Sequence, residues 1–490
     1  MGKAATIRSG TINLLNTIIG AGILAMPYGL KSNGLVFGCL LIVWSSLTSS
    51  MGLYLQSKVA KYTAQTEAVS YFSLAQLTYP QFSILFDSAI AIKCFGVGVS
   101  YLVIIGDLMP KIMESLDVAS GSILMHRNFW ITIFMALIVV PLSYLKKLDS
   151  LRYTSIVALF SVVYLICLVV FHYSVSDIPL EEPKQITWIG PVSLKSTLSS
   201  FPIFVFAYTC HQNMFAIINE LKPRLGEGEA GSKTRQSNII IRNAIATACA
   251  SYLVVGIIGY LTFGDLVNGN IITMYPKNSI SSLIGRLSIV IMVSLSYPLQ
   301  CHPCRGSVNH VYYYLTKGFS KEETPKLRNH PSVLNSAGHR YSNDGETLGL
   351  TADIESVADN SSIGADESFV STTPVEGAQD TDGHGPIIVP LTSRRFYIIT
   401  TCIVLLSYLV AVTVTSLEHV LAFVGSTGST SISFILPGLF GYLLIKPLDG
   451  GDVLSTKEKF CKYGGLALAI WGVIVMVVCL SATIFLGATH

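Results

Sequence analysis

Two glycines and a proline interrupt the first apolar stretch of the chain, and these residue types free the peptide backbone for binding. Residues 16–27 read N-T-I-I-G-A-G-I-L-A-M-P, inside an apolar run long enough to cross a bilayer as a helix. Gly20, Gly22 and Pro27 all weaken a helix. Unwound backbone is tolerated in a membrane only where it is buried in protein or lines a watery cavity. The pattern indicates a ligand held by backbone groups, although glycines also serve close helix packing.

A second interruption combines a proline with a polar patch. Residues 199–213 read S-S-F-P-I-F-V-F-A-Y-T-C-H-Q-N. An apolar opening that contains Pro202 therefore turns polar where the middle of a spanning helix would be. A histidine inside a membrane usually faces a cavity or a polar partner, so His211 is a candidate site residue. The alternative is that a neighbouring backbone carbonyl in the helix bundle satisfies its ring.

These motifs must be positioned by helices that cross a membrane. Of the 490 residues, 51% are hydrophobic and 12% are charged, against about 25% charged in a soluble domain. We expect an all-α polytopic membrane protein. Its eleven apolar runs of spanning length lie at approximately 7–30, 34–57, 83–109, 128–146, 151–173, 197–220, 239–262, 281–304, 394–416, 419–444 and 464–487.

The two interruptions occupy matching places if the chain contains two repeats of five spans. Spans 1–5 and 6–10 would each begin with a broken helix, and five spans per half require the halves to have opposite topology. Interrupted spans in corresponding positions of two halves are the best sequence-level pointer to a transporter site. This arrangement makes the two breaks face each other near the middle of the membrane, which favours binding over simple packing.

Basic residues predict the orientation of the chain in the membrane. With a cytoplasmic N-terminus, the cytoplasmic connections hold Lys58, Lys61 and Arg242 among others, and the C-terminal His490 lies on the opposite side. Residues 341–390 contain ten acidic residues and no Lys or Arg, a composition typical of disorder. We therefore divide the chain into membrane helices 1–8 at 1–316, a disordered acidic cytoplasmic loop at 317–390, and membrane helices 9–11 at 391–490.

Two other polar motifs have a structural interpretation. Cys301-His302-Pro303-Cys304 has metal-like spacing, but no second matching pair accompanies it. We expect no metal here, and we expect Arg305 to mark the end of span 8 at the cytoplasmic interface. The small polar residues 425–430 in span 10 suit either close packing around a moving bundle or the lining of a pathway.

The residues do not support catalysis. A membrane-embedded hydrolase would need a paired nucleophile and base or metal ligands such as H-E-x-x-H, and none occurs in the sequence. We expect no cofactor and no nucleic-acid partner, with membrane lipid around most of the surface. A non-transporting sensor and an ion channel are the alternative classes, although a channel would show repeated pore loops or charged rings.

Three motifs together resemble the amino acid/auxin permease family, and within it the fungal vacuolar amino acid transporters. They are I-I-G-A-G-I-L-A-M-P in span 1, F-A-Y-T-C-H-Q-N in span 6 and S-Y-P-L-Q-C-H-P-C-R at 296–305. The resemblance implies a LeuT-like fold of eleven helices, a five-plus-five inverted repeat plus one helix, with helices 1 and 6 broken. It also implies proton-linked export of amino acids from the vacuole to the cytosol by alternating access, and a lumenal C-terminus.

In such a transporter the breaks would hold the common backbone of all amino acids. The N–H groups of span 1 would bind the carboxylate at a half-helix N-terminus, and the carbonyl groups freed in span 6 would face the ammonium. The expected substrate-binding residues are Thr17, Gly20, Ala21, Gly22, Ile23, Phe206, Ala207, Tyr208 and Thr209.

The coupling ion is open between a proton and sodium. Animal relatives bind sodium between an Asn of span 1 and a Thr of span 8, and these positions are matched here by Asn16 and Ser296. The fungal vacuolar relatives resemble proton-linked carriers. For a proton, His211 and Glu220 at the end of span 6 are the titratable candidates. We expect proton coupling, with sodium less favoured.

Overall fold

The computed structural model describes residues 6–62, 69–145, 154–176, 178, 183–222, 229–317, 391–446 and 454–487. The secondary-structure elements of these residues are all helical. The loop expected at 317–390, apart from Lys317, and the C-terminal His490 lie outside the described residues.

Spans 1 to 5 are built from a series of long helices and short turns. Their elements are α1 (Ile7–Ile18), η1 (Ala21–Ala25), α2 (Met26–Asn33), α3 (Leu35–Val59), η2 (Ala60–Tyr62), α4 (Tyr71–Thr78), η3 (Pro80–Phe82), α5 (Ser83–Ser115), η4 (Ile123–Met125), α6 (Arg127–Phe134), the π-turn η5 (Met135–Val139), α7 (Val140–Ser143) and α8 (Thr154–Val175).

Spans 6 to 11 complete the described helices. Their elements are α9 (Leu194–Ala207), α10 (His211–Glu220), α11 (Glu229–Phe263), η7 (Gly264–Leu266), η8 (Ile271–Thr273), α12 (Ile280–Lys317), α13 (Ser393–Thr413), α14 (Leu417–Val424), the π-turns η9 (Gly425–Ser429) and η10 (Ser431–Ile435), α15 (Leu436–Leu444) and α16 (Thr456–Gly487).

Ten of the eleven expected runs form helices long and apolar enough to span a membrane within the described residues, if the bent first pair counts as one span. The fourth run is shorter, because its apolar helix covers Arg127–Ser143 with a π-turn in the middle. Large apolar side chains such as Leu47 and Phe160 are exposed on the outside of these helices, as expected where lipid is the solvent.

Span 8 is longer than the sequence pattern indicated. The helix that forms it does not end near Arg305, because α12 continues to Lys317. Arg305 is only 2% exposed and lies over the ring of Phe396. Its guanidinium donates to Ser143 O at 3.2 Å and to Thr400 Oγ1 at 3.1 Å. The positive charge is thus held by groups of neighbouring helices.

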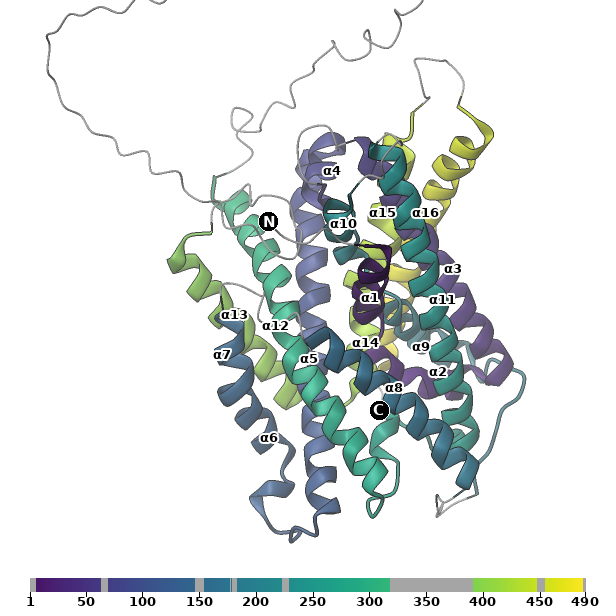
Figure 1. Ribbon diagram of the computed structural model, residues 1–490, viewed down its shortest axis with the longest axis vertical. Coiled ribbons are helices and arrows are strands. Elements are labelled where there is room, and N and C mark those ends of the chain that lie inside the picture. Colours follow the sequence, from purple (N-terminus) through teal and green to yellow (C-terminus); the bar gives the residue numbers. More distant parts are fainter. Residues whose placement is uncertain are drawn as a thin grey trace, which may run out of the picture. The chain divides into compact units, whose positions relative to one another are not determined.

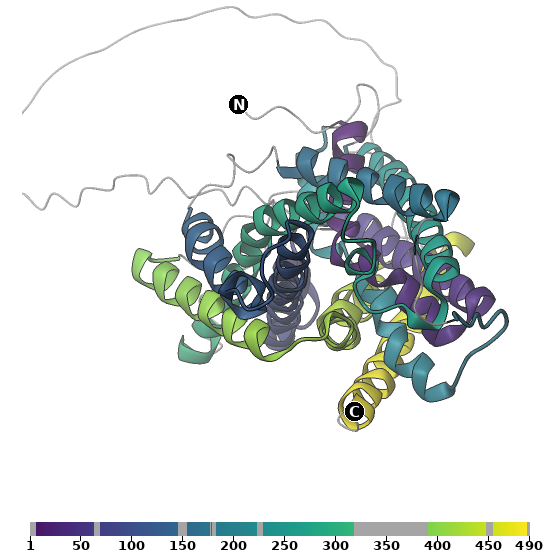
Figure 2. The same ribbon diagram turned by 90° about the horizontal axis from the view of Figure 1, so that it is seen from below.

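Each of the two broken spans packs against several other helices. α1 packs against α11, α10 and α8, and α9 packs against α2, α14 and α16. Figure 1 shows α6, α7 and α13 together on one flank and α3 and α11 on the other, and Figure 2 keeps these groups apart in the second view. We name the end where α3 finishes and α11 begins the basic end, and the end with residues 264–279 the loop end.

Close packing at small residues holds span 10 against its neighbours. A β-carbon at Gly425 would lie 2.0 Å from Pro202 O of α9, and one at Gly428 would lie 2.7 Å from Ala89 O of α5. Apolar surface alone does not drive helices together in lipid, so such backbone approaches carry much of the association. The packing interpretation of residues 425–430 therefore holds for both glycines, which lie in the π-turn η9.

Candidate functional site

The break in span 1 is a short non-helical step between two half-helices. α1 starts with a capping box in which Thr6 and Ser9 bond each other's backbone, and it ends at Ile18. Gly20 has φ −137° and ψ −137°, and no side chain caps the turn that starts at Ala21. The segments Ile7–Ile18 and Ala21–Asn33 are bent by 48°. Pro27 sits at the start of α2, where its missing N–H needs no partner.

The break in span 6 lies at Tyr208, Thr209 and Cys210, between α9 and α10. Thr209 Oγ1 donates to Val205 O at 2.7 Å, a local side-chain bond that competes with helix continuation. No side chain caps the start of α10 at His211. The polar patch seen in the sequence is therefore where the helix opens.

The two breaks touch each other. A β-carbon at Gly22 would lie 2.8 Å from Ala207 Cβ and 2.9 Å from Ala207 Cα, so only glycine allows this approach of the two backbones. The Tyr252 hydroxyl of α11 lies 2.8 Å from both Ile18 O and Ala207 O. Because a hydroxyl has one hydrogen, the two carbonyl oxygens share it. One buried tyrosine thus ties both breaks together.

Helix α3 supports span 6 from a second direction. Ser49 Oγ donates to Tyr208 O at 3.0 Å, and His211 Nε2 lies 3.2 Å from Ser49 O. Gln56 Nε2 donates to His211 O at 3.3 Å and also to the Tyr71 hydroxyl. The open backbone at the start of α10 is held in place by these side chains.

Several buried polar atoms at the span 6 break have no hydrogen-bond partner among the described residues. They are His211 Nδ1 and both amide atoms of Gln212. Buried polar atoms are normally hydrogen-bonded, and an unpaired one costs about 1–3 kcal/mol. Such a concentration of unpaired groups beside opened backbone is what a polar ligand or ordered water would satisfy.

The expected substrate-binding residues come together around the two breaks. Ala21, Gly22 and Ile23 are buried, as are Phe206, Ala207, Tyr208 and Thr209, while Thr17 and Gly20 are half-buried. Asn213 Nδ2 donates to Thr17 Oγ1 at 2.9 Å, and this bond links α10 of span 6 to α1 of span 1 beside the breaks. Each of the opened carbonyl oxygens already accepts one bond, since Phe206 O accepts from Thr209 N at 3.0 Å just as Ala207 O and Tyr208 O accept from Tyr252 and Ser49.

The expected ion-coupling residues do not form one cluster. Asn16 Nδ2 donates to Ser155 Oγ of α8 at 3.2 Å, and no hydrogen bond joins Asn16 to Ser296 in the described residues. Glu220 is exposed at the end of α10, about 14 Å along the helix from His211 at 1.5 Å per residue. Of these four residues, only His211 lies at a break.

Three residues near the breaks were missed by sequence reasoning. Tyr252 and Ser49 bond the opened backbone, and the Tyr101 hydroxyl of α5 would lie 3.5 Å from a β-carbon at Gly20. A tyrosine in a spanning helix needs a partner for its hydroxyl, and this is the signal that could have identified Tyr252 and Tyr101. Ser49 gives no comparable signal, because serines bond their own helix freely.

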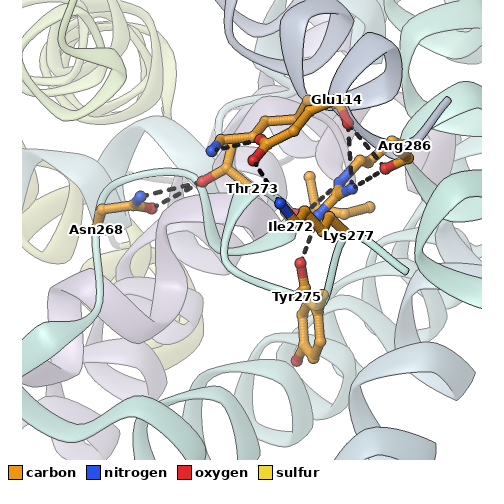
Figure 3. Close-up of polar contacts among 9 residues, drawn as sticks. Glu114, Asn268, Ile272, Thr273, Tyr275, Lys277 and Arg286 are labelled. Atoms are coloured by element: carbon orange, nitrogen blue, oxygen red, sulfur yellow. Dashed lines mark hydrogen bonds and ion pairs between the residues drawn. The ribbon is translucent and has the colours of Figure 1, made fainter. Parts of the chain in front are cut away.

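At the loop end, the hydrogen bonds of Arg286 connect the loop to neighbouring helices, and we call this group of contacts the latch. Residues 264–279 run between α11 and α12, and η8 contacts η1 at the break in span 1. Arg286 of α12 is 1% exposed and donates to Ser115 Oγ at 2.9 Å, to Ile272 O at 3.4 Å and to Tyr275 O. Figure 3 shows Arg286 between Glu114 on one side and the loop residues Ile272 and Tyr275 on the other. The latch ties the loop to the end of α5.

Comparison with known proteins agrees with this geometry. A family model described as transmembrane amino acid transporter protein matches residues 3–478. The chain is 44% identical over 486 residues to vacuolar amino acid transporter 6 of Saccharomyces cerevisiae, covering 99% of this chain and 100% of that protein. It is 40% identical over 506 residues to vacuolar amino acid transporter 5 of the same yeast, covering 99% of each.

The fold has a counterpart among solved structures. A crystal structure of MhsT in complex with L-phenylalanine matches with a TM-score of 0.56 and 10% identity, over 99% of this chain and 100% of that one. This likeness concerns the fold alone and confirms the LeuT-like architecture with broken helices 1 and 6. The family resemblance of the three sequence motifs is confirmed by the matching family model. The chain belongs to the transmembrane amino acid transporter family.

Proposed function

We propose that this protein carries free amino acids from the vacuole to the cytosol by proton-coupled alternating access. The observation that carries the proposal is the contact of the two breaks, where Gly22 and Ala207 meet and one hydroxyl serves both backbones. Opened backbone at this depth offers N–H and C=O groups in one place. The names of the two similar yeast proteins support the substrate class and the compartment.

The carboxylate of the amino acid would bind at the start of the segment Ala21–Asn33. The first N–H groups of a helix have no partner within it, and the helix dipole places partial positive charge there. No side chain caps this start, and Gly22 has no β-carbon to obstruct it. The Tyr101 hydroxyl lies beside Gly20 and can donate to the same carboxylate.

The ammonium would bind the opened carbonyl groups of span 6. Ala207 O shares the Tyr252 hydroxyl and Tyr208 O accepts from Ser49, but a carbonyl oxygen has two lone pairs and can accept a second bond. Residues 19–25 and 208–212 contain no Asp or Glu. The backbone itself would therefore recognise the charge that all amino acids share, and transport would not depend on an acidic partner.

Proton coupling would pass through His211. Its Nδ1 has no hydrogen-bond partner within the part of the chain that the structure describes, while its Nε2 faces Ser49 O, so a second proton would be accepted at Nδ1. Binding of sodium by Asn16 and Ser296 is less well supported, since Asn16 bonds Ser155 instead.

The accessibility of the two ends supports alternating access. At the loop end, η8 covers η1, and a β-carbon at Gly269 would lie 3.1 Å from Glu418 Cβ. Towards the basic end, Asn13 is exposed while Thr17 and Gly20 are half-buried, at a spacing that puts them on one face of the half-helix. This conformation is closed at the loop end, which we assign to the vacuolar lumen.

Uptake into proteoliposomes tests the proposal. The purified full-length protein is reconstituted, and labelled amino acids are offered under an imposed proton gradient or an imposed sodium gradient. We expect accumulation against the amino acid gradient only with the proton gradient, abolished by a protonophore. Binding without flux under either gradient would instead identify a sensor, and flux that never concentrates substrate would identify a channel.

The variant His211→Gln tests the coupling residue. Glutamine can still donate to Ser49 O but does not titrate, so we expect exchange of labelled for unlabelled amino acid to continue while proton-driven accumulation is lost. The matched control is His172→Gln in α8, a second buried histidine whose Nε2 lies 3.0 Å from Ser281 Oγ, away from the breaks. Unchanged proton dependence in His211→Gln would remove His211 from the mechanism.

A further inference from the structure

A cavity opens at the loop end between α2, α9, α14 and α16, outside the site described above. Its volume is about 300 Å³, at the lower end of the range for small-molecule pockets. Polar residues from the start of α9 line it, and the buried apolar residues Ile203 and Ala422 lie in its wall. Ile203 is four residues from Ala207, about 6 Å along α9. The lining therefore reaches to within about one helical turn of the break in span 6.

Two opposite charges line this cavity, Lys195 of α9 and Glu418 of α14. Lys195 is exposed and Glu418 is half-buried. Among the described residues, neither side chain forms a hydrogen bond or an ion pair, with the other or with a third group. Unlike charges that share one space without pairing leave room between them for a ligand that carries one charge of each sign.

Hydroxyl groups accompany the two charges. Five serines line the cavity, namely Ser32, Ser193, Ser196, Ser199 and Ser200. Ser193 Oγ accepts from Ser196 N and Ser199 Oγ donates to Lys195 O, both at 3.0 Å, so these two hydroxyls serve their own helix. The Ser196 hydroxyl makes no hydrogen bond to any described residue. It follows Lys195 directly in the chain and can donate to the same anion as the ammonium does.

We propose that this cavity is a second amino acid site, which holds a neutral, zwitterionic amino acid at the loop end before that amino acid reaches the breaks. The carboxylate binds Lys195 and Ser196, the ammonium binds Glu418, and the side chain lies towards Ile203 and Ala422. A ligand with a net charge leaves one of the two site charges unmatched.

The position of the cavity fits a waiting site. A β-carbon at Gly269 would lie 3.1 Å from Glu418 Cβ, so the carboxylate that binds the ammonium lies beside the loop that closes this end. The order of binding, with the cavity before the breaks, rests on the proposed function. The pairing of the two charges with a zwitterion rests on the cavity alone.

Equilibrium binding to the full-length purified protein in nanodiscs tests the proposal. The probe is tritiated L-leucine, titrated to millimolar concentrations. We expect two classes of binding site in the wild type. The double variant Lys195→Gln with Glu418→Gln should weaken one class by about tenfold or more, because hydrogen bonds to charged groups are lost. Ser196→Ala should weaken the same class by a smaller factor.

The matched control is Asp117→Asn with Lys277→Gln. It also removes one charge of each sign from exposed residues at the loop end, outside the cavity. Asp117 has a φ of 54°, a conformation that Asn tolerates. This control should bind leucine as the wild type does at both classes of site.

The outcomes separate this site from the proposed function. A single class of sites in the wild type, with proton-driven uptake intact, would overturn the second site and leave the proposed function standing. Two classes of site without any uptake would do the reverse. Unchanged binding in the Lys195 and Glu418 variant, at an unchanged unfolding temperature, would show that the cavity is not the second site. Equal competition by leucinamide, L-glutamate or L-lysine at the affected class would overturn the assignment to a neutral zwitterion.

Discussion

At the scale of single residues, the two glycines of the first break have different roles. Both weaken the helix, but only Gly22 faces the second break, where a β-carbon would lie 2.8 Å from Ala207 Cβ. A β-carbon at Gly20 would be 3.5 Å from the Tyr101 hydroxyl, an ordinary contact distance. The sequence treats both glycines alike, as residues that weaken the helix, whereas the structure gives them different neighbours.

Gly22→Ala should reduce amino acid uptake by tenfold or more at equal protein level. The added methyl group must push the backbones of the two breaks apart, and overpacking of this kind costs about 1–3 kcal/mol. Gly20→Ala is the matched control and should stay within about threefold of wild type, since its methyl group meets no atom closer than 3.5 Å. Equal loss in both variants, measured in proteoliposomes, would mean that helix propensity and not contact with Ala207 sets the effect.

Tyr252→Phe should lower both stability and transport. The change leaves Ile18 O and Ala207 O without their shared donor, and an unpaired buried acceptor costs about 1–3 kcal/mol. Tyr260→Phe on the same helix removes a hydroxyl that accepts from Thr187 N at 2.9 Å, at the loop end and far along the helix from the breaks. It should lose stability without a change in the KM for amino acids. Matching KM values in the two variants would count against a role for Tyr252 at the site.

At the scale of elements, the half-helices depend on a few side chains from other helices. α3 contributes Ser49 and Gln56, and α11 contributes Tyr252, so the opened backbone is buried yet largely bonded. At the loop end, the Arg286 guanidinium connects α12 both to α5 and to the loop at 264–279. Rigid surroundings of this kind keep the opened backbone in place, because a spanning segment without its helix bonds is otherwise costly in lipid.

Arg286→Met should lower the thermal unfolding temperature of the purified protein by several degrees. The substitution keeps apolar bulk but removes the donors for Ile272 O, Tyr275 O and Ser115 Oγ, and hydrogen bonds to a charged group are worth about 1.5–3 kcal/mol each.

The control for this latch is Lys277→Gln. Its ammonium lies 3.5 Å from Glu114 Oε1, but its side chain is 57% exposed, and exposed ion pairs contribute about 0–1 kcal/mol. We expect almost no shift in unfolding temperature. A control that destabilises as much as Arg286→Met would show that the surface ion pair, and not the buried guanidinium, holds the loop.

At the scale of the whole molecule, the loop end must open if the protein works by alternating access. The loop residue Gly269 packs against Glu418 at the start of α14, with a β-carbon at the glycine 3.1 Å from Glu418 Cβ. Paired cysteines usually have β-carbons about 3.5–4.5 Å apart, so a disulfide needs only a small local adjustment here.

The double variant Gly269→Cys with Glu418→Cys should lose uptake on oxidation and regain it on reduction. Each single variant, treated with the same oxidant, should keep its activity and so accounts for the native cysteines. Crosslinking is followed by mass spectrometry and transport by uptake into proteoliposomes. Full activity of the crosslinked protein would show that the loop end does not open during the cycle.

The positions of the spans and of both breaks were predictable from the sequence, because apolar run length, glycine and proline are local properties. The repeat logic then placed the breaks opposite each other, and the contact of Gly22 with Ala207 agrees with it. The family also followed from local motifs, since three short segments were enough to indicate it.

Only the tertiary structure decided which side chains serve the breaks. Tyr252 lies in an ordinary apolar run, and its contact with Ile18 spans 234 positions of the chain. The extension of α12 beyond Arg305 and the bond of Asn16 to Ser155 depend in the same way on neighbouring helices. Hydropathy and composition report what a segment prefers locally. The rotation of each helix, and hence the partner of each polar group, is set by packing between segments far apart in sequence.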